Sequence, residues 1–434
     1  MPQTTRNPKP GRSVIMQKNW RVWQKNFRQL LPSLKLDKKK MGIRTKILIV
    51  DDSRIFRGAI EESLAGEQDI QIIGSVRNGV KAIEFIRSKR PDLVTLDVEM
   101  PDMGGLETLK AIQEINASSG DEPSIGVIMI SSFTQKGADI TIQALEAGAF
   151  DFITKPESKS PEESIETLRR QLVVKIRYFA SRQISRRIKG KRAEDRKSRK
   201  GVTRQKTADS SLPRESDARI TGPGTCASRI SRASSAAPPS KIKAILIGVS
   251  TGGPKALAEM LPLLCEKVRL PIFIVQHMPE TFTHSLANSL DARCTYTVAE
   301  AKNNDLVQEG HVYIAPGGKH LLLRRKGVNV VAVINTQEPE RGCRPSVDVL
   351  FRSAATAYSG DVIAIILTGM GEDGTKGAGV LKRSGAYVIA QDEESSVVWG
   401  MPGSAEASGH VDTVLPLDKI PDRVSMVIQK SDGS

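Results

Sequence analysis

Five side chains in the first part of the chain could together transfer a phosphoryl group. Asp51 and Asp52 follow the first of five short apolar runs, Asp97 and Ser131 end the third and fourth, and Lys155 follows the fifth. Because the carboxyl ends of parallel strands gather at one edge of a sheet, these side chains are expected to meet there. Three carboxylates make a hard-oxygen site suited to Mg²⁺. A carboxylate nucleophile, a hydroxyl and a lysine beside such a metal are what acyl-phosphate formation needs, so the group predicts a phosphorylatable aspartate.

A second group of side chains, in the second half of the chain, could carry out nucleophilic catalysis. Ser250 lies in the stretch GVSTGGP, between an apolar run and a helical run. A serine at such a corner lies near backbone N–H groups that can stabilise an oxyanion. The same Gly/Ser-rich loop is also compatible with a phosphate cradle or a plain turn, so this feature alone leaves the chemistry open.

Every histidine of the chain lies in this half, so histidine-dependent catalysis is expected here. The five are His277, His284, His311, His320 and His410. His277 directly follows an apolar run in VQHMP and is predicted at the same sheet edge as Ser250. His284, on an expected helix, and His320, after a glycine turn, are its rivals.

A carboxylate to orient the imidazole is expected from the loop TGMGEDG that follows the apolar run 362–367. Glu372 and Asp373 both suit that role, which fixes the tautomer and stabilises the imidazolium. The resulting order is Ser…His…Asp. α/β-Hydrolases have the order Ser…Asp…His, so the serine motif does not predict that fold.

Short apolar runs and helical patterns alternate in both halves of the chain. In the first half, strands are predicted at 46–50, 71–75, 93–96, 125–130 and 152–154, with helices at 54–65, 79–88, 105–114 and 139–147. In the second half, strands are predicted at 244–248, 272–275, 312–314 and 362–367. Such alternation predicts parallel sheets covered by helices on both faces, five-stranded in the first half.

The first half resembles the receiver domain of two-component response regulators. The matching stretches are VDDS at 50–53, LDVEMPDMGGLETL at 96–109, MISSFT at 129–134 and DFITKP at 151–156. The resemblance implies a flavodoxin-like fold, and it assigns roles as follows: Asp97 is the phospho-acceptor, Asp51, Asp52 and Asp97 hold Mg²⁺, Ser131 and Lys155 sense the phosphate, and Phe152 is an aromatic switch. The sequence departs from the usual pattern at Gly104–Gly105, where such proteins have Asp-Gly, outside the acidic pocket.

The second half resembles the catalytic domain of the chemotaxis protein-glutamate methylesterase family over nearly all of residues 241–430. The matching stretches are GVSTGGPKAL, VQHMPETFT, YIAPGGKHLLL, CRPSVDVLFRSAA, LTGMGEDG and GMPGSA, with GGKH and PGSA slightly unusual. The resemblance implies a doubly wound, Rossmann-like α/β domain. Its implied roles are Ser250 as nucleophile, His277 as general base and acid, Asp373 rather than Glu372 as orienting carboxylate, and Met370 as an oxyanion N–H donor with Thr251 close by.

Together the two resemblances imply a phosphorylation-activated serine carboxylic-ester hydrolase. It would hydrolyse glutamate γ-methyl esters on chemoreceptors, and deamidate selected receptor glutamines, in chemotaxis adaptation. The implied partners are methyl-accepting chemoreceptors and a chemotaxis histidine kinase as phosphodonor. Mg²⁺ is implied at the receiver and no cofactor at the esterase site. The expected protein is a monomer in the cytoplasm, associated peripherally with membrane receptor arrays.

The chain's net charge of +15 is concentrated in two segments, 1–40 and 181–240, which carry +10 and +11. The other 334 residues therefore carry −6. We predict a disordered basic extension at 1–40, a receiver at 41–180, a basic Ser/Pro-rich linker at 181–240 and a catalytic domain at 241–434. The chain before Met41 is expected to be an over-long gene model or a dispensable extension.

Composition narrows the remaining choices. No run of about 18 apolar residues and no secretory signal is present, and the four cysteines are too widely spaced for a zinc site, which favours reduced thiols in the cytoplasm. Basic segments with few aromatics are a weak basis for nucleic-acid binding. The linker is expected to be a solvated spacer, or else to bind acidic receptor surfaces or anionic membrane. Two alternative functions stay open: a non-enzymatic receiver-linked binding module, and an esterase with another substrate.

Overall fold

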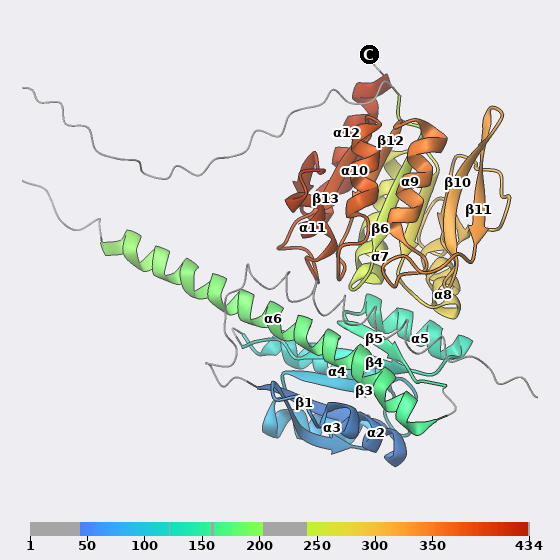
Figure 1. The fold of residues 1–434 in the computed structure, drawn as a ribbon. Helices are drawn as coiled ribbons and strands as arrows, with labels where there is room; N and C mark the ends of the chain where they lie inside the picture. Colours follow the sequence, from blue (N-terminus) through green and yellow to red (C-terminus); the bar gives the residue numbers. More distant parts are fainter. Residues whose placement is uncertain (1–43, 121, 158–159, 203–240, 433–434) are drawn as a thin grey trace, which may run out of the picture. The chain divides into compact units, whose positions relative to one another are not determined.

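The computed structural model describes residues 44–120, 122–157, 160–202 and 241–432 (Figure 1). The predicted extension at 1–40 and most of the predicted linker, residues 203–240, lie outside the described residues. The predicted domain boundaries therefore remain predictions. The described chain folds as two α/β units, one before and one after residues 203–240 in the sequence.

A five-stranded parallel sheet forms the first unit. Its strands are β1 (Thr45–Val50), β2 (Ile70–Val76), β3 (Leu93–Asp97), β4 (Gly126–Ser131) and β5 (Asp151–Thr154), in the order β2-β1-β3-β4-β5. Every residue of β3 and β4 is buried, as expected for central strands covered on both faces. The strand order reverses between β1 and β3, so the residues after these two strands meet at the switch point of the sheet.

Helices cover both faces of this sheet. They are α2 (Arg54–Leu64), α3 (Gly79–Lys89), α4 (Gly105–Ser118), α5 (Gln135–Glu146) and α6 (Pro161–Val202). Apolar residues of α2 and α6 share one core cluster with the sheet, and those of α3, α4 and α5 share the other. Side-chain caps begin several helices: Ser53 Oγ accepts the Phe56 N–H at the start of α2, and Asn78 Oδ1 accepts the Lys81 N–H at the start of α3.

Two helices of this unit differ from the sequence prediction. Helix α5 begins four residues before the predicted Asp139, because Thr134 caps it by accepting the Gly137 N–H. Helix α6 runs to Val202 and so extends into the predicted linker (Figure 1). The low hydrophobicity of that stretch indicated a linker, but lysine, arginine and glutamate are good helix formers.

The second unit is built on a seven-stranded parallel sheet. Its strands are β6 (Ala244–Val249), β7 (Ile272–Gln276), β8 (Thr297–Glu300), β9 (His311–Ile314), β12 (Val362–Ile366), β13 (Tyr387–Gln391) and β14 (Thr413–Leu415), in the order β14-β13-β12-β6-β7-β9-β8. All neighbouring pairs are parallel, which confirms the doubly wound α/β prediction. The chain leaves β6 toward β7 and later returns to its other side as β12, which makes the β6/β12 boundary a switch point.

The remaining elements of this unit cover its sheet. Helices α7 (Gly253–Lys267), α8 (Glu280–Asp291) and α12 (Ile420–Asp432) contribute to one core cluster; α9 (Val347–Tyr358), α10 (Thr375–Arg383) and α11 (Met401–Ala407) contribute to the other, and a short 3₁₀ helix, η2, covers Leu417–Lys419. An antiparallel hairpin, β10 (His320–Lys326) with β11 (Asn329–Asn335), packs on α9 and stands apart from the seven-stranded sheet (Figure 1).

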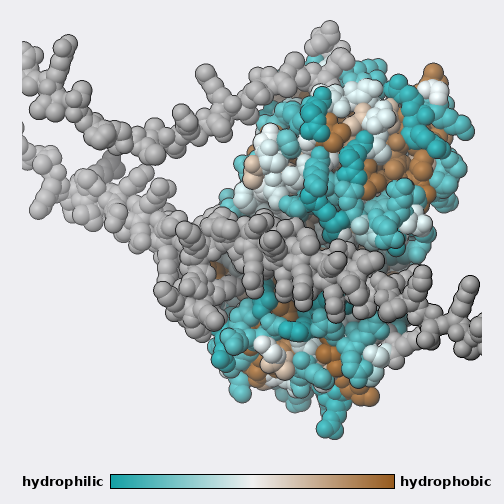
Figure 2. All heavy atoms as spheres, in the orientation of Figure 1, coloured by the Kyte–Doolittle hydropathy of each residue, from teal (hydrophilic) through white to brown (hydrophobic). Residues whose placement is uncertain are grey.

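Hydrophilic residues cover most of the visible described surface, with smaller hydrophobic patches between them (Figure 2). Within the described residues, no helix combines the length and the apolar character that crossing a bilayer requires.

Candidate active site and phosphorylation site

Three carboxylates converge at the C-terminal edge of the five-stranded sheet. Asp51 and Asp97 are buried, Asp52 is exposed, and one oxygen of each lies within 4.8 Å of the others. Lys155 Nζ lies 2.8 Å from Asp97 Oδ2 and 3.0 Å from Asp51 Oδ2. Apart from this ion pair, Asp51 Oδ2 has no hydrogen-bond partner among the described residues. A buried carboxylate oxygen that has no further hydrogen bond and lies beside two other carboxylates fits the oxygen ligand set of Mg²⁺.

Electrostatics in this pocket favour the arrival of a cation. Burial raises the pKa of Asp97 to about 6; the hydrogen bond from Lys155 opposes this shift and the charge of Asp51 adds to it. Burial lowers the pKa of Lys155, but its contacts with Asp97 and Asp51 outweigh burial and the pKa is raised. One lysine thus leaves the three carboxylates with surplus negative charge, which a divalent cation would neutralise.

The other two predicted receiver residues lie on neighbouring strands. Ser131 ends β4 and is fully buried, one position beyond the residue that pairs with Asp97. The ring of Phe152, on β5, stacks on Phe282 with a centroid distance of 4.6 Å. Phe282 belongs to α8 of the other unit, so the predicted switch residue lies at the contact between the two units.

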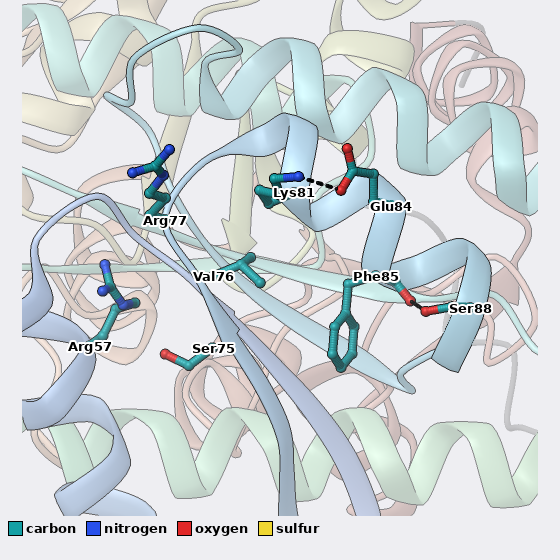
Figure 3. A pocket seen from close by; sticks show the side chains of 8 residues that line it. All are labelled: Arg57, Ser75, Val76, Arg77, Lys81, Glu84, Phe85 and Ser88. Carbon is teal, nitrogen blue, oxygen red and sulfur yellow. Dashed lines mark hydrogen bonds and ion pairs between the residues drawn. The ribbon is translucent and has the colours of Figure 1, made fainter.

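A groove beside β2 and α3 is separate from these residues (Figure 3). It is lined by Arg57, Ser75, Val76, Arg77, Lys81, Glu84, Phe85 and Ser88. Lys81 Nζ pairs with Glu84 at 2.8 Å, and Arg57 donates to the backbone oxygen of Asp51. None of the predicted site residues lines this groove.

The three predicted catalytic residues of the second unit follow three adjacent strands. Ser250 follows β6, His277 follows β7, and Asp373 lies in the loop after β12. The Ser250 N–H donates to Thr368 O at 3.0 Å, and the His277 N–H donates to Val249 O at 3.2 Å. These backbone bonds tie the three loops together at the switch point of the sheet.

Asp373 is the carboxylate that contacts the histidine. His277 Nε2 lies 2.8 Å from Asp373 Oδ2. Asp373 also accepts hydrogen bonds from Ser346 Oγ and from the N–H groups of Val347, Asp348 and Gly374, at 2.7–3.0 Å. Five donors thus hold a carboxylate that is almost completely buried.

Charges in this cluster match a base held by an ionised carboxylate. Burial raises the pKa of Asp373, but the hydrogen bond and charge of His277 outweigh it, and the pKa is lowered. Burial lowers the pKa of His277, but the charge of Cys343 and the hydrogen bond to Asp373 outweigh it, and the pKa is raised well above its usual value. The pair therefore stabilises the imidazolium that general-base catalysis creates.

The rival residues lie elsewhere. Glu372 pairs with Arg341. The side chain of His284 is about half exposed, and its Nδ1 lies 3.7 Å from Glu300 Oε2. His320 Nε2 lies 3.2 Å from the backbone oxygen of Glu338. Within the described residues, neither histidine contacts Asp373.

The remaining link, between serine and histidine, is not formed in this structure. Among the described residues, no hydrogen bond joins Ser250 Oγ to the imidazole ring. His277 Nδ1 instead faces Cys343 Sγ at 3.9 Å. Val249 pairs with Gln276 in the sheet, so Ser250 and His277 occupy matching positions just after adjacent strands. Proton transfer requires Ser250 Oγ to come within hydrogen-bond distance of His277 Nδ1.

Candidate oxyanion donors surround the serine. Within the described chain, no backbone–backbone hydrogen bond outside helices and strands uses the N–H of Met370 or Thr251. A Cβ added at Gly369 would lie 2.8 Å from the Ser250 Cβ, so only glycine lets the Met370 loop approach so closely. The Ser250 carbonyl accepts a hydrogen bond from Gln276 Nε2 at 2.9 Å, which helps to hold the turn between β6 and α7 in place.

Sequence reasoning missed several residues that support this site. Besides Gln276, these are Cys343 and the segment with Ser346 and Asp348, which lie in the stretch CRPSVDVLF. Asp348 is fully buried and accepts the Gly377 N–H at 2.6 Å. Burial raises its pKa to about 6, and the charge of Asp373 adds to this. The stretch is part of the family resemblance, which was the available signal.

Described residues of the two α/β units are in direct contact. Thr251 Oγ1, beside the candidate nucleophile, donates to Asp151 Oδ2 at 2.7 Å. Asp151 immediately precedes Phe152 and also pairs with Lys175 of α6. Helices α5 and α8 make further contacts, and Val398 packs into the core cluster shared with α2 and α6. The receiver thus touches the loops that carry the candidate catalytic residues.

Comparisons with known proteins identify the family. A profile described as CheB methylesterase matches residues 245–424, and one described as response regulator receiver domain matches residues 47–167. A protein-glutamate methylesterase/protein-glutamine glutaminase of Desulfotalea psychrophila is 40% identical over 380 residues, which cover 86% of this chain and 96% of that protein. The chain belongs to this family.

A second relative and a solved structure are also similar to this chain. The enzyme so named from Trichodesmium erythraeum is 40% identical over 382 residues, covering 87% of this chain and 97% of its own. The crystal structure of the Thermotoga maritima CheB methylesterase catalytic domain is 44% identical and covers 43% of this chain and 99% of that chain, with a TM-score of 0.42. Membership of the protein-glutamate methylesterase family confirms both resemblances drawn from the sequence, and its receiver domain implies Mg²⁺ at the phosphorylation site.

Proposed function

We propose that this protein is a phosphorylation-activated protein-glutamate methylesterase that acts on chemoreceptors. The observation that carries the proposal is the His277–Asp373 pair, whose contact atoms lie 2.8 Å apart. His277 directly follows β7, the strand next to β6, which Ser250 follows. A domain of this family with a binding role alone has no need of a buried carboxylate held by five donors beside a histidine and a serine.

In the proposed reaction, Ser250 Oγ attacks the carbonyl carbon of a glutamate γ-methyl ester while His277 Nδ1 accepts its proton. Asp373, bonded to Nε2, stabilises the resulting imidazolium. The imidazolium then protonates the leaving methoxide, methanol departs and an acyl-enzyme remains. Water, deprotonated by the same histidine, attacks the acyl-enzyme and restores serine and glutamate.

The negative oxygen that forms in both steps needs donors fixed in advance. The N–H groups of Met370 and Thr251 are proposed for this role, since loops beside Ser250 carry both and no other loop hydrogen bond of the described backbone uses them. The same steps on a receptor glutamine release ammonia in place of methanol. No metal is needed for this chemistry.

The receiver pocket is proposed to control the esterase. Asp97 is the proposed phospho-acceptor, with Asp51 and Asp52 as its partners in holding Mg²⁺, which would neutralise charge on the transferring phosphoryl group. Lys155, 2.8 Å from Asp97, would then pair with the phosphoryl oxygens, and Ser131 would donate to them.

Movement of this pocket has a direct route to the esterase contacts. Lys155 follows β5, which also carries Asp151 and Phe152, the residues bonded to Thr251 and stacked on Phe282. We propose that the unphosphorylated receiver restricts access to Ser250 and that phosphorylation shifts the population toward an open form.

Partners and location follow from this function. Methyl-accepting chemoreceptors are the proposed substrates and a chemotaxis histidine kinase is the proposed phosphodonor. We propose that the protein is a cytoplasmic monomer held peripherally at receptor arrays, where it would encounter both the chemoreceptors and the kinase. The basic segment 181–240 is proposed as a spacer.

The decisive experiment is methanol release from methylated chemoreceptor membranes by wild type and Ser250→Ala, each with and without a small phosphodonor and Mg²⁺. Release that rises with the phosphodonor and vanishes in Ser250→Ala supports the enzyme and its control. No release from wild type in either state, with Asp97 demonstrably phosphorylated, would favour a binding module instead. Release from other methylated proteins but not from receptors would assign a different substrate.

A further inference from the structure

A thiol lies beside the catalytic histidine on the side where the serine is expected. Cys343 Sγ is 3.9 Å from His277 Nδ1, and Asp373 Oδ2 is 2.8 Å from the other ring nitrogen. One potential ligand atom from each of His277, Cys343 and Asp373 lies within 4.8 Å of the other two. We propose that His277 Nδ1 and Cys343 Sγ bind a thiophilic divalent cation such as Zn²⁺, and that the bound ion inhibits the enzyme.

The separation of the two donors suits a bridging ion. Zinc lies about 2.3 Å from a thiolate sulfur and about 2.0–2.1 Å from an imidazole nitrogen. With these lengths, donors 3.9 Å apart subtend an angle of about 127° at the metal, and a tetrahedral angle needs them about 0.4 Å closer. A small rotation of either side chain supplies that change.

The surroundings of His277 match those of zinc-bound histidines. Such histidines commonly donate their second ring N–H to a carboxylate, which fixes the tautomer and strengthens the ligand. Asp373 is in that position. Its oxygens are already held by five donors, so it acts on the ion through the imidazole rather than as a ligand.

The loop that carries Cys343 is anchored. Glu340 and Cys343 exchange two backbone hydrogen bonds, at 2.8 and 3.1 Å. Arg352 Nη1 bonds to the Glu340 carboxylate at 2.9 Å, and Arg341 pairs with Glu372, next to Asp373. The thiol is therefore held at a fixed place beside the imidazole and is not the tip of a free loop.

The site is open enough for an ion to enter. Cys343 is partly exposed, and the His277 side chain is 15% exposed. Two protein ligands leave the remaining positions to water, so binding is weaker and more readily reversed than at four-ligand structural zinc sites.

Inhibition follows from the atom that the ion occupies. When the ion binds, the Cys343 sulfur coordinates it as a thiolate, and any proton on the sulfur passes to solvent. The metal also takes the lone pair of His277 Nδ1, which is the lone pair that must accept the Ser250 proton. The inhibition rests on the proposed esterase function, whereas the binding itself does not.

The test uses the full-length protein, freed of metal and then supplied with Mg²⁺. Zn²⁺ is titrated against methanol release by wild type, Cys343→Ser and, as a matched control, Cys294→Ser, each compared with its own rate without zinc. We expect wild type and Cys294→Ser to lose their activity and to regain it with EDTA, while Cys343→Ser keeps its own rate. Equal inhibition of Cys343→Ser would overturn the proposal.

A second measurement does not depend on activity. Co²⁺ bound to a thiolate gives a sulfur-to-metal charge-transfer absorption, which carboxylates do not produce. We expect this band in wild type, in Cys294→Ser and in Asp97→Asn, and its loss in Cys343→Ser. A band retained in Cys343→Ser, or absent from wild type, would refute the site. If wild type releases no methanol even without zinc, the proposed function fails and the cobalt band still decides the metal site.

Discussion

Glu146 links the two domains at a distance from both reaction centres. Its carboxylate, on the receiver helix α5, accepts the Ser289 hydroxyl of α8 at 2.6 Å and pairs with Arg293. If the unphosphorylated receiver must separate from the esterase domain to admit substrate, these bonds stabilise the closed form. We predict that Glu146→Ala raises esterase activity in the absence of phosphodonor.

The size of the effect follows from the two contacts. The Glu146 side chain is 8% exposed, so a hydroxyl bonded to its charge contributes about 1.5–2 kcal/mol. The Arg293 side chain is 47% exposed, and solvent reduces that ion pair to about 0.5–1 kcal/mol. Loss of both, about 2–3 kcal/mol, shifts the closed-to-open ratio by about 30- to 150-fold. Ser289→Ala, which removes only the hydroxyl, gives about a 10- to 30-fold shift.

The assay is methanol release with and without phosphodonor. Unphosphorylated activity rises toward the phosphorylated rate and cannot pass it, so the activation ratio shrinks in the order wild type, Ser289→Ala, Glu146→Ala. Glu84→Ala is the matched control, because Glu84 is an exposed receiver carboxylate whose one partner among the described residues is Lys81 of its own helix. A folded Glu146→Ala protein with the wild-type activation ratio would refute the idea that this contact holds the closed form.

Four further outcomes are expected. Ser250→Ala lowers kcat by about 10⁶-fold with an unchanged far-ultraviolet circular dichroism spectrum, as loss of a serine nucleophile does elsewhere. Because the pKa of His277 is raised and only the neutral ring accepts a proton, kcat/KM falls on the acid side at a pH above 6.5. Cys343→Ser removes one charge that raises this pKa, so the acid limb of its pH profile moves to lower pH. Asp97→Asn abolishes the response to phosphodonor, and an Asp97→Asn protein that is still activated would place the phosphate elsewhere.

Much of the fold could be predicted from sequence because the central strands are short apolar runs. The five receiver strands lie within a residue or two of the predicted ranges. In the second unit, β8, β13, β14 and the β10–β11 hairpin were not predicted. Strands β8 and β14 lie at the edges of the sheet and have mixed or partial burial, so they lack a long apolar run. Strand β13 and the two hairpin strands do contain apolar runs and were overlooked. The end of α6 could not be located from the sequence, because a charged helix has no apolar stripe to reveal it.

The candidate site was predictable to the extent that it depends on strand ends. Ser250 and His277 each follow a strand directly, so the parallel sheet brings them to one edge. The choice of Asp373 over Glu372 could not come from such reasoning, because adjacent carboxylates on one loop differ only in direction. Cys343 lies 66 residues from His277 on a long connection, and no periodic pattern encodes where such a loop folds back.

The order of the catalytic residues follows from the path of the chain through its sheet. The chain forms β6, continues on one side to β7, and reaches β12 on the other side only after the excursion through β8, β9 and the hairpin. Residues after these three strands must therefore meet, whatever their order in sequence. The receiver uses the same geometry between β1 and β3, and there the meeting residues are carboxylates rather than a serine and a histidine. The two sheets thus provide equivalent edges, and the side chains placed at each edge decide whether it holds a hard cation for phosphoryl transfer or a nucleophile for ester hydrolysis.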